Sequence, residues 1–317
     1  MSVRRSMEMH RRLALAALAL LVVAASSWAA AASRANAAPP EQKLTPVTQS
    51  VLSPPRSYRA DAGRFHLSYE LELTTAVPIP VTVTSIAVLR GNGGRIESLR
   101  GDRLERSLGP LGDPSASTRL LPASSVGIVW VDLTFDRRSQ VPNRVKHRLT
   151  VDLGPGLPVE PIITDTGGRS AIAKRPAVEI GAPVRGGRWV AVVGPHRRAL
   201  QPVNGRLRNG QRFAIDFSAR LDDADRTHVA DPNLNGSYFN YGQPVQAVGP
   251  GRVVEAVDRY PDQPPNHPNP VTGVAADGNH VIVKLGKGVF AAYAHLEPGS
   301  VRVEAGDPVR EGQVIGR

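Results

Sequence analysis

Apolar and polar residues alternate along the clearest patterned stretches of this 317-residue chain, and this alternation limits what the chain can fold into. Phe65, Leu67, Tyr69, Leu71 and Leu73 occupy every second position, and the segment 81–89 continues a similar period. A period of two places successive side chains on opposite faces of a strand. Helical periodicity is absent from the second half, where glycines separate short apolar runs. The sequence therefore predicts an all-β protein.

Turn-forming stretches divide the chain into five predicted parts. We expect a signal peptide at 1–37, a linker at 38–55, a β-sandwich of immunoglobulin-like type at 56–155, a second linker at 156–186 and a second, incomplete antiparallel β domain at 187–317. The linkers are inferred from Pro, Ser, Gln and Gly without apolar period. No catalytic cluster is found in the predicted sandwich, so His66 and His147 are expected to be structural or surface histidines.

The amino-terminal residues have the order of a secretory leader. Arg4, Arg5, Arg11 and Arg12 precede an apolar stretch from Leu13 to about Ala25, and the small-residue site Ala35-Asn36-Ala37 follows. The sequence thus predicts export to the periplasm or the medium, with a retained membrane anchor as the alternative. Because the chain has no cysteine, disulfides and a lipid anchor are excluded.

The formal net charge of +11 comes almost wholly from arginine. An exported basic protein is attracted to anionic cell-wall polymers or lipid head groups. Genome composition explains the arginine content equally well. A nucleic-acid role is not predicted, because no helix concentrates the charge and aromatic residues make up only 5%.

Four motifs in the second half carry a more specific signal, and no single one of them would suffice. In chain order they are a hairpin from Gly242 to Ala247, a strand from Gly278 to Val281, the run Tyr293 to Leu296, and a turn from Val309 to Gly316. Together, over roughly 189–317, they resemble the lysostaphin or LytM-type zinc metalloendopeptidases. The resemblance implies a duplicated hybrid motif fold, a Zn²⁺ cofactor, and peptidoglycan as the partner whose peptide cross-bridges are cleaved.

The resemblance also implies roles for individual residues. His295 matches a catalytic histidine that is not a metal ligand, and Asp216 matches the metal-binding aspartate. A buried acid between Ile215 and Phe217 would need such a partner. The usual first ligand, four residues before the aspartate, is replaced by Arg212, which has no lone pair to donate. His196 is the nearest upstream histidine and is predicted to be the first ligand, the alternative being a loop histidine among arginines.

The remaining histidines are weaker candidates. His228 and His267 are expected in polar loops, and His280 is expected to be structural. The His-x-His motif that carries the third zinc ligand and a second catalytic histidine in such enzymes is absent before Arg317. The expectation is therefore a carboxyl-terminally truncated chain that is inactive as written.

Two alternative functions are considered, of which the first remains open. A non-catalytic module that binds the cell wall or regulates amidases is favoured by Arg212 at a ligand position. A biotinyl or lipoyl carrier domain is disfavoured, because Lys284 and Lys287 are expected in or beside a strand instead of at an exposed hairpin tip. The Pro-rich stretch 258–277 is expected to form one wall of the substrate groove.

Overall fold

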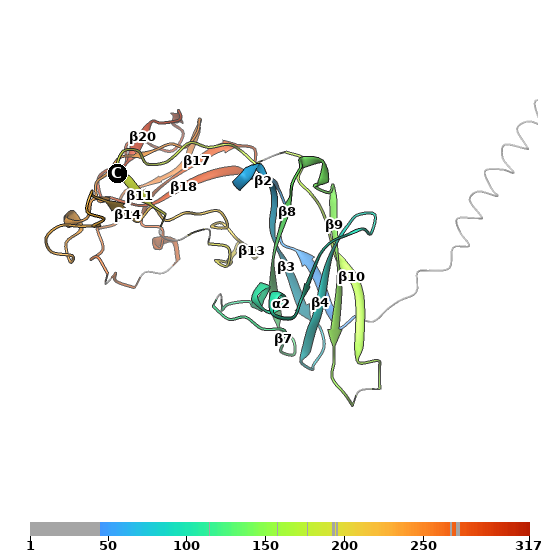
Figure 1. The fold of residues 1–317 in the computed structure, drawn as a ribbon. Helices are drawn as coiled ribbons and strands as arrows, with labels where there is room; N and C mark the ends of the chain where they lie inside the picture. The colour runs from blue at the N-terminus through green and yellow to red at the C-terminus, as the bar shows by residue number, and fades with distance from the viewer. Residues whose placement is uncertain are drawn as a thin grey trace, which may run out of the picture. The chain divides into compact units, whose positions relative to one another are not determined.

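The computed structural model describes residues 45–317, except 114, 157, 176, 192, 193, 195, 267, 271 and 272. The predicted signal peptide lies outside this range. Within the described range, no helix has the length and apolar character that crossing a membrane requires. The elements are nearly all antiparallel strands, so the all-β prediction is confirmed (Figure 1).

Two five-stranded sheets make up a β-sandwich. The first has the order β1 (Val47–Val51), β3 (Phe65–Thr75), β8 (Val126–Phe135), β6 (Leu108–Pro110), and β2 (Ser57–Arg59) also pairs with β3. The second has the order β10 (Ile162–Ala171), β9 (Arg144–Asp152), β4 (Val81–Arg90), β5 (Arg95–Arg100), and β7 (Leu120–Leu121) also pairs with β4. One short helix, α2 (Gly101–Ser107), follows β5 and buries Leu104.

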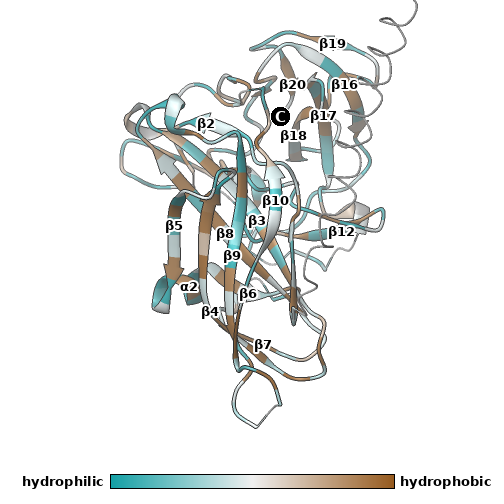
Figure 2. Ribbon diagram, turned by 90° about the vertical axis from the view of Figure 1, so that its right-hand side faces the viewer, coloured by the Kyte–Doolittle hydropathy of each residue, from teal (hydrophilic) through white to brown (hydrophobic). Residues whose placement is uncertain are grey.

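The period-two pattern explains how the sandwich core forms. Leu67, Tyr69, Leu71 and Leu73 on β3 are at most 1% exposed and share one hydrophobic cluster with residues of β4, β8 and β9. Hydrophobic and hydrophilic segments alternate along these strands in Figure 2. Each sheet therefore turns one face inward, and burial of these apolar side chains is the main stabilising contribution.

Strands β1 and β10 lie in segments that the sequence analysis assigned to linkers. Val47–Val51 pairs with Thr75–Leu71 of β3, and β10 pairs along most of its length with β9. Neither strand alternates cleanly between apolar and polar residues. In β10, Gly167 and Gly168 interrupt the pattern, and the pairing with β9 shifts register there. Their backbone hydrogen bonds come from neighbours distant in sequence, so local pattern alone did not reveal them.

The second half contains smaller sheets and a separate hydrophobic cluster. Its four-stranded sheet has the order β18 (Val289–Leu296), β17 (Asn279–Gly286), β16 (Gly251–Val257), β19 (Pro308–Val309). Three two-stranded pairs accompany it: β11 (Arg188–Val190) with β14 (Ala219–Leu221), β12 (Gln201–Val203) with β13 (Arg206–Arg208), and β15 (Val245–Gln246) with β20 (Val314–Gly316). Four single-turn 3₁₀ helices complete the described elements: η1 (Asp61–Gly63), η2 (Arg138–Gln140), η3 (Asn235–Ser237) and η4 (Gly273–Ala275).

Candidate functional site

The four sequence motifs pair with one another in the structure. The first motif supplies β15 and the fourth supplies β20, and these strands pair through Val245 and Gly316. The second and third motifs supply β17 and β18, which pair along most of their length. Tyr293 connects the two pairs, because its buried hydroxyl accepts a hydrogen bond of 2.7 Å from the backbone N–H of Val248. The motifs therefore specify one packed β domain.

His295 lies in a β-bulge at the end of β18. Asn279 pairs with Leu296 and Val281 pairs with Tyr293, so two residues between partners on β18 face a single residue, His280, on β17. His295 also has a φ of 59°, in the left-handed region that non-glycine residues rarely adopt. Bulges re-aim side chains and are frequent beside active sites.

The surroundings of His295 hold the bulge in place. Its backbone N–H donates to the carbonyl of Asp277 at 3.0 Å. The side-chain nitrogen of Asn279 donates to the carbonyls of Tyr260 and Leu296 at 2.8 and 3.3 Å, and its oxygen accepts from the N–H groups of Arg259 and Tyr260. Tyr293 and Leu296 are buried while His295 is exposed. The Tyr-x-His-Leu run thus fixes two side chains in the core and presents the histidine to solvent.

The conformation of His295 gives a stability prediction. Replacing His295 with glycine is expected to keep the free energy of unfolding unchanged or raise it by up to about 1 kcal/mol, because glycine adopts positive φ without steric cost. Replacing it with valine is expected to lower that free energy by about 1–2 kcal/mol, since a β-branched side chain clashes in this region. Urea denaturation of the two variants checks the order. A valine variant as stable as the glycine variant would contradict the strained backbone.

His196 and Asp216 are brought together, 20 residues apart in sequence. His196 Nε2 lies 3.0 Å from Asp216 Oδ1, and the two side chains are 26% and 44% exposed. Gly194 permits this approach. A Cβ at Gly194 would lie 2.8 Å from the carbonyl oxygen of Ala214 and 3.1 Å from Cα of Ile215, and its φ of 147° also disfavours other residues. Close backbone packing at Gly194 therefore sets the His196 loop against the Asp216 segment.

Asp216 is less buried than the sequence predicted. The segment from Phe213 to Ile215 is not a buried strand, since Phe213 and Ile215 are 56% and 51% exposed and Phe213 lies in a turn. Asp216 is half-exposed, so no desolvation cost forces it to find a partner. Its contact with His196 is the observation that now marks it.

The arginines beside these residues have structural partners in the sandwich. Arg212 forms an ion pair with the buried Glu70 of β3, with Nε 2.8 Å from Oε1. Arg197 lies 3.3 Å from Asp132, and Arg198 stacks over the ring of Trp130 at 4.3 Å. Arg212 at the expected ligand position thus carries a different role, which is to attach this segment to the sandwich.

The other histidines have identifiable structural surroundings. His66 stacks on Tyr58, the ring of His228 contacts that of Tyr238 in a tilted arrangement, and His280 Nδ1 donates a hydrogen bond to the carbonyl oxygen of Gly278. His147 is fully buried in the sandwich core instead of lying at the surface. His267 lies outside the described residues.

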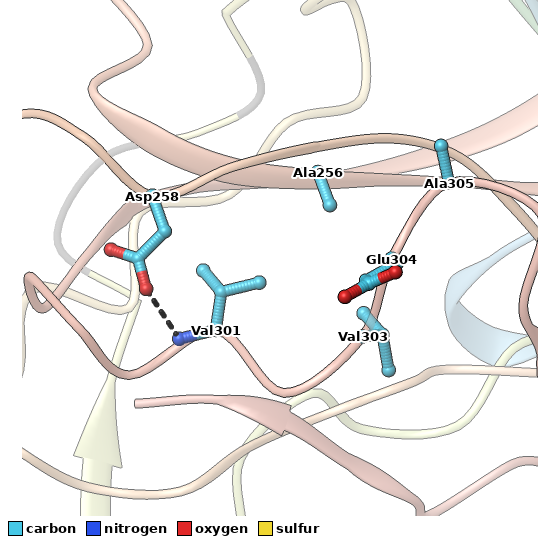
Figure 3. A pocket seen from close by; sticks show the side chains of 6 residues that line it. All are labelled: Ala256, Asp258, Val301, Val303, Glu304 and Ala305. Carbon is cyan, nitrogen blue, oxygen red and sulfur yellow. Dashed lines mark hydrogen bonds between the residues drawn. The ribbon is translucent and has the colours of Figure 1, made fainter.

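No group of three or more metal-binding side chains occurs in the part of the chain that the structure describes. His196 and Asp216 are thus a pair, and His295 does not join them as a third donor. One pocket of the second half has a volume of about 280 Å³ and is lined by two carboxylates, Asp258 and Glu304, but by no histidine. Asp258 accepts hydrogen bonds from the N–H groups of Gly299 and Val301, and Figure 3 shows the one with Val301. Asp258 therefore stabilises the turn at Gly299–Val301, and none of the candidate residues lines this pocket.

The structure also bears on the two lysines of the carrier-domain alternative and on the stretch 258–277. Lys287 is exposed at the tip of the β17–β18 hairpin, so the position of the lysines does not argue against a carrier domain as the sequence analysis held. That the Pro-rich stretch 258–277 forms a wall of the substrate groove stays a prediction. Its residues Asp262, Gln263 and Asn266 contact the segment 232–241, where the Tyr241 hydroxyl donates to Asp262 at 2.5 Å. That hydrogen bond is the main cause that raises the pKa of Tyr241 to about 12.

The second half thus contains a small all-β domain with an exposed histidine on a strained bulge, and a histidine–carboxylate pair that precedes this domain in sequence. Residues 237–317 match the model of Peptidase family M23, and the second half therefore carries a domain of this metallopeptidase family. The match includes all four motifs and His295, whereas His196 and Asp216 precede it. It supports a metallopeptidase of peptidoglycan-hydrolase type and replaces the carrier reading.

Comparisons with other proteins add little to the family match. No curated protein matches the chain. One similar solved structure is the Northeast Structural Genomics Consortium target SoR45, which is 10% identical, with 40% of this chain and 83% of that chain covered and a TM-score of 0.24. A likeness this weak carries no weight for fold or function.

Proposed function

We propose that this chain is an exported, zinc-dependent endopeptidase that cleaves the peptide cross-bridges of bacterial peptidoglycan. The contact between His196 and Asp216, which precede the Peptidase family M23 domain in sequence, is the observation that carries the proposal. The order of charged, apolar and small residues at the amino terminus supports export.

The spacing of the pair fits two ligands of one zinc ion. Zinc–nitrogen and zinc–oxygen distances of about 2.0–2.1 Å at a tetrahedral angle place two ligand atoms about 3.3 Å apart. The atoms Nε2 of His196 and Oδ1 of Asp216 lie 3.0 Å apart, close to that separation. Imidazole nitrogen and carboxylate oxygen are both normal zinc donors. The described residues thus offer two of the three protein ligands that a catalytic zinc site of this kind uses.

Each residue then has a defined task. Bound zinc would polarise the scissile carbonyl and activate the attacking water. His196 and Asp216 would hold the ion, and Gly194 would keep their two segments in contact. His295 would exchange a proton with the reacting groups, because imidazole is the side chain that most often acts as a general acid or base. The bulge would keep its ring aimed out of the sheet.

A zinc-binding comparison tests the proposal. His196→Ala and Asp216→Asn are each expected to weaken zinc binding at least tenfold, because each removes one donor. Zinc is measured by competition with a chromophoric chelator, and release of soluble peptides from purified peptidoglycan is measured in parallel. His228→Gln is the matched control, since His228 is also half-buried but its ring contacts that of Tyr238 and no described carboxylate. Unchanged zinc affinity in both ligand variants would refute the assignment.

The second candidate function is a non-catalytic module that binds the cell wall or regulates an amidase. Arg212 favours it, because the usual first ligand is replaced by a residue that pairs with Glu70. The same measurements separate the two functions. Binding to peptidoglycan without zinc and without peptide release would establish the module, whereas zinc-dependent release that is lost in His295→Ala would establish the enzyme.

A further inference from the structure

The outer face of the second sandwich sheet is hollowed along the central strand β4. Its floor is made of small side chains, Ser85 and Ala87, since the alternating residues Ile86 and Val88 point into the core and are fully buried. Longer side chains stand on both sides, on β5 and on β9. The hollow has a volume of about 260 Å³, and we call it the β4 trough.

Strand register places cationic side chains along both walls of the β4 trough. Arg148 of β9 lies opposite Ala87, Arg100 of β5 lies opposite Ser85, and Arg95 of β5 lies opposite Leu89. All three arginines line the trough and are exposed. None of them forms an ion pair with a described carboxylate, and no acidic residue lines the trough. Three guanidinium groups therefore face one hollow without neutralisation.

Hydroxyl groups complete the lining. Ser98 lies opposite Ala87 and accepts a hydrogen bond of 3.3 Å from Arg100 Nε, which orients that guanidinium along the wall. Thr150 lies opposite Ser85 on the other wall. Guanidinium forks bind the oxygens of phosphate or carboxylate groups in a bidentate manner, and hydroxyls donate further hydrogen bonds to them. The chemistry of the lining thus selects oxyanions.

The extent of the β4 trough indicates the kind of anion. The rows through Ser85 and Leu89 are four residues apart, which at about 3.3 Å per residue separates them by about 13 Å. Cations distributed over that length offer more than one anion site, and they suit a chain with repeated anionic groups better than a single small anion. The lining contains no aromatic residue on which bases would stack, so a nucleic acid is the less suitable polyanion.

We infer that the β4 trough binds a linear polyanion of the cell envelope, whose repeating unit carries a phosphodiester or a carboxylate and no aromatic base. This site is separate from the metallopeptidase residues, and only the location of its ligand in the cell envelope rests on the proposed export. Through the β4 trough, the sandwich holds the chain on an anionic polymer by charge and bidentate hydrogen bonds.

The test measures binding of the full chain to three labelled probes by fluorescence anisotropy at low salt. The probes are a glycerol-phosphate oligomer, a galacturonate oligomer and an oligothymidylate of equal charge. The triple variant Arg95→Gln, Arg100→Gln, Arg148→Gln is expected to bind the preferred oligomer at least tenfold more weakly and with a flatter salt dependence. Which of the first two probes binds more tightly identifies the phosphodiester or the carboxylate as the ligand group.

A matched control separates the trough from net charge. Arg138→Gln, Arg175→Gln, Arg302→Gln removes the same charge from exposed positions outside the lining and is expected to bind as the wild type does. Thermal unfolding verifies that both triple variants are folded. Equal losses in the two triple variants, or no binding of either oligomer, would overturn the inference. So would binding of the oligothymidylate at least tenfold more tightly than either oligomer, since bases would then be recognised.

Discussion

Replacing Arg212 with methionine is expected to lower the free energy of unfolding by about 3–5 kcal/mol, because it leaves a buried carboxylate without its counter-charge. Glu70 is 2% exposed, and its Oε1 accepts hydrogen bonds from Arg212 Nε at 2.8 Å and from Asn209 Nδ2 at 2.9 Å. Its Oε2 accepts a further bond from Arg212 Nη2. Methionine keeps much of the volume of arginine but supplies no donor. Urea denaturation at neutral pH measures the loss.

Two further variants test whether the loss of stability comes from the buried ion pair. Arg103→Met breaks the exposed pair between Arg103 and Glu97 and is expected to cost less than about 1 kcal/mol, since surface pairs contribute little. The double variant Glu70→Leu, Arg212→Met removes both charges and is expected to regain most of the stability that Arg212→Met loses. A loss for Arg212→Met no larger than that for Arg103→Met would show that the buried pair is not formed.

The ion pair gives Arg212 a structural role at the position where the resemblance would place a first metal ligand. Through Glu70, Arg212 holds the chain segment 197–212 against β3. Close backbone packing at Gly194 brings His196 to Asp216 in the same region. Under the proposed function, His196 would supply the donor that Arg212 cannot.

The sequence predicted the parts of the fold in which local pattern and burial agree. Clean alternation in 65–73 and 81–89 corresponds to β3 and β4, whose inner faces are fully buried. Strands β1 and β10 were assigned to linkers because their pairing partners, β3 and β9, provide the order that their own residues do not. Strand formation there depends on long-range hydrogen bonds.

The candidate site was predictable to a similar degree. The resemblance predicted roles for His295, Asp216 and His196, which stay predictions, and the structure brings the last two into contact. It could not show the bulge at His295, because a bulge is a property of register between two strands. The Gly278-Asn279 dipeptide was the available signal, since glycine with positive φ and an asparagine with several backbone partners are typical of such irregular strand ends.

The buried His147 leads to the second large prediction, a loss of stability in mild acid. His147 is fully buried, and its Nδ1 lies 2.9 Å from the carbonyl oxygen of Gly168, so Nδ1 carries the hydrogen. Nε2 therefore accepts from the Tyr69 hydroxyl at 2.8 Å. The neutral ring is satisfied at both nitrogens. Burial lowers the pKa of His147 to about 4, because a charged imidazolium is poorly solvated in the core.

The direction of the pH dependence of stability follows from proton binding by the folded and the unfolded chain. The unfolded chain, with an ordinary pKa near 6.5, binds a proton between pH 6.5 and 4, whereas the folded chain does not. Acid in this range therefore favours unfolding. Stability contributed by neutral His147 is fully present above pH 6.5 and is lost as the pH falls towards 4. Integrated from pH 7 to pH 5, the expected loss is about 2 kcal/mol.

Urea denaturation at pH 7, 6 and 5 measures this dependence directly. His147→Phe is expected to be less stable at every pH, since Tyr69 and Gly168 lose a partner, but to show a pH dependence about 2 kcal/mol smaller over the interval. Tyr69→Phe is the matched control, because it removes one hydrogen bond from the same contact and keeps a titratable, buried His147. The same steep dependence in His147→Phe as in Tyr69→Phe would assign the acid sensitivity to other groups. A dependence that disappears only with His147 would show that the core of the sandwich, and not the candidate site, limits the stability of the chain in acid.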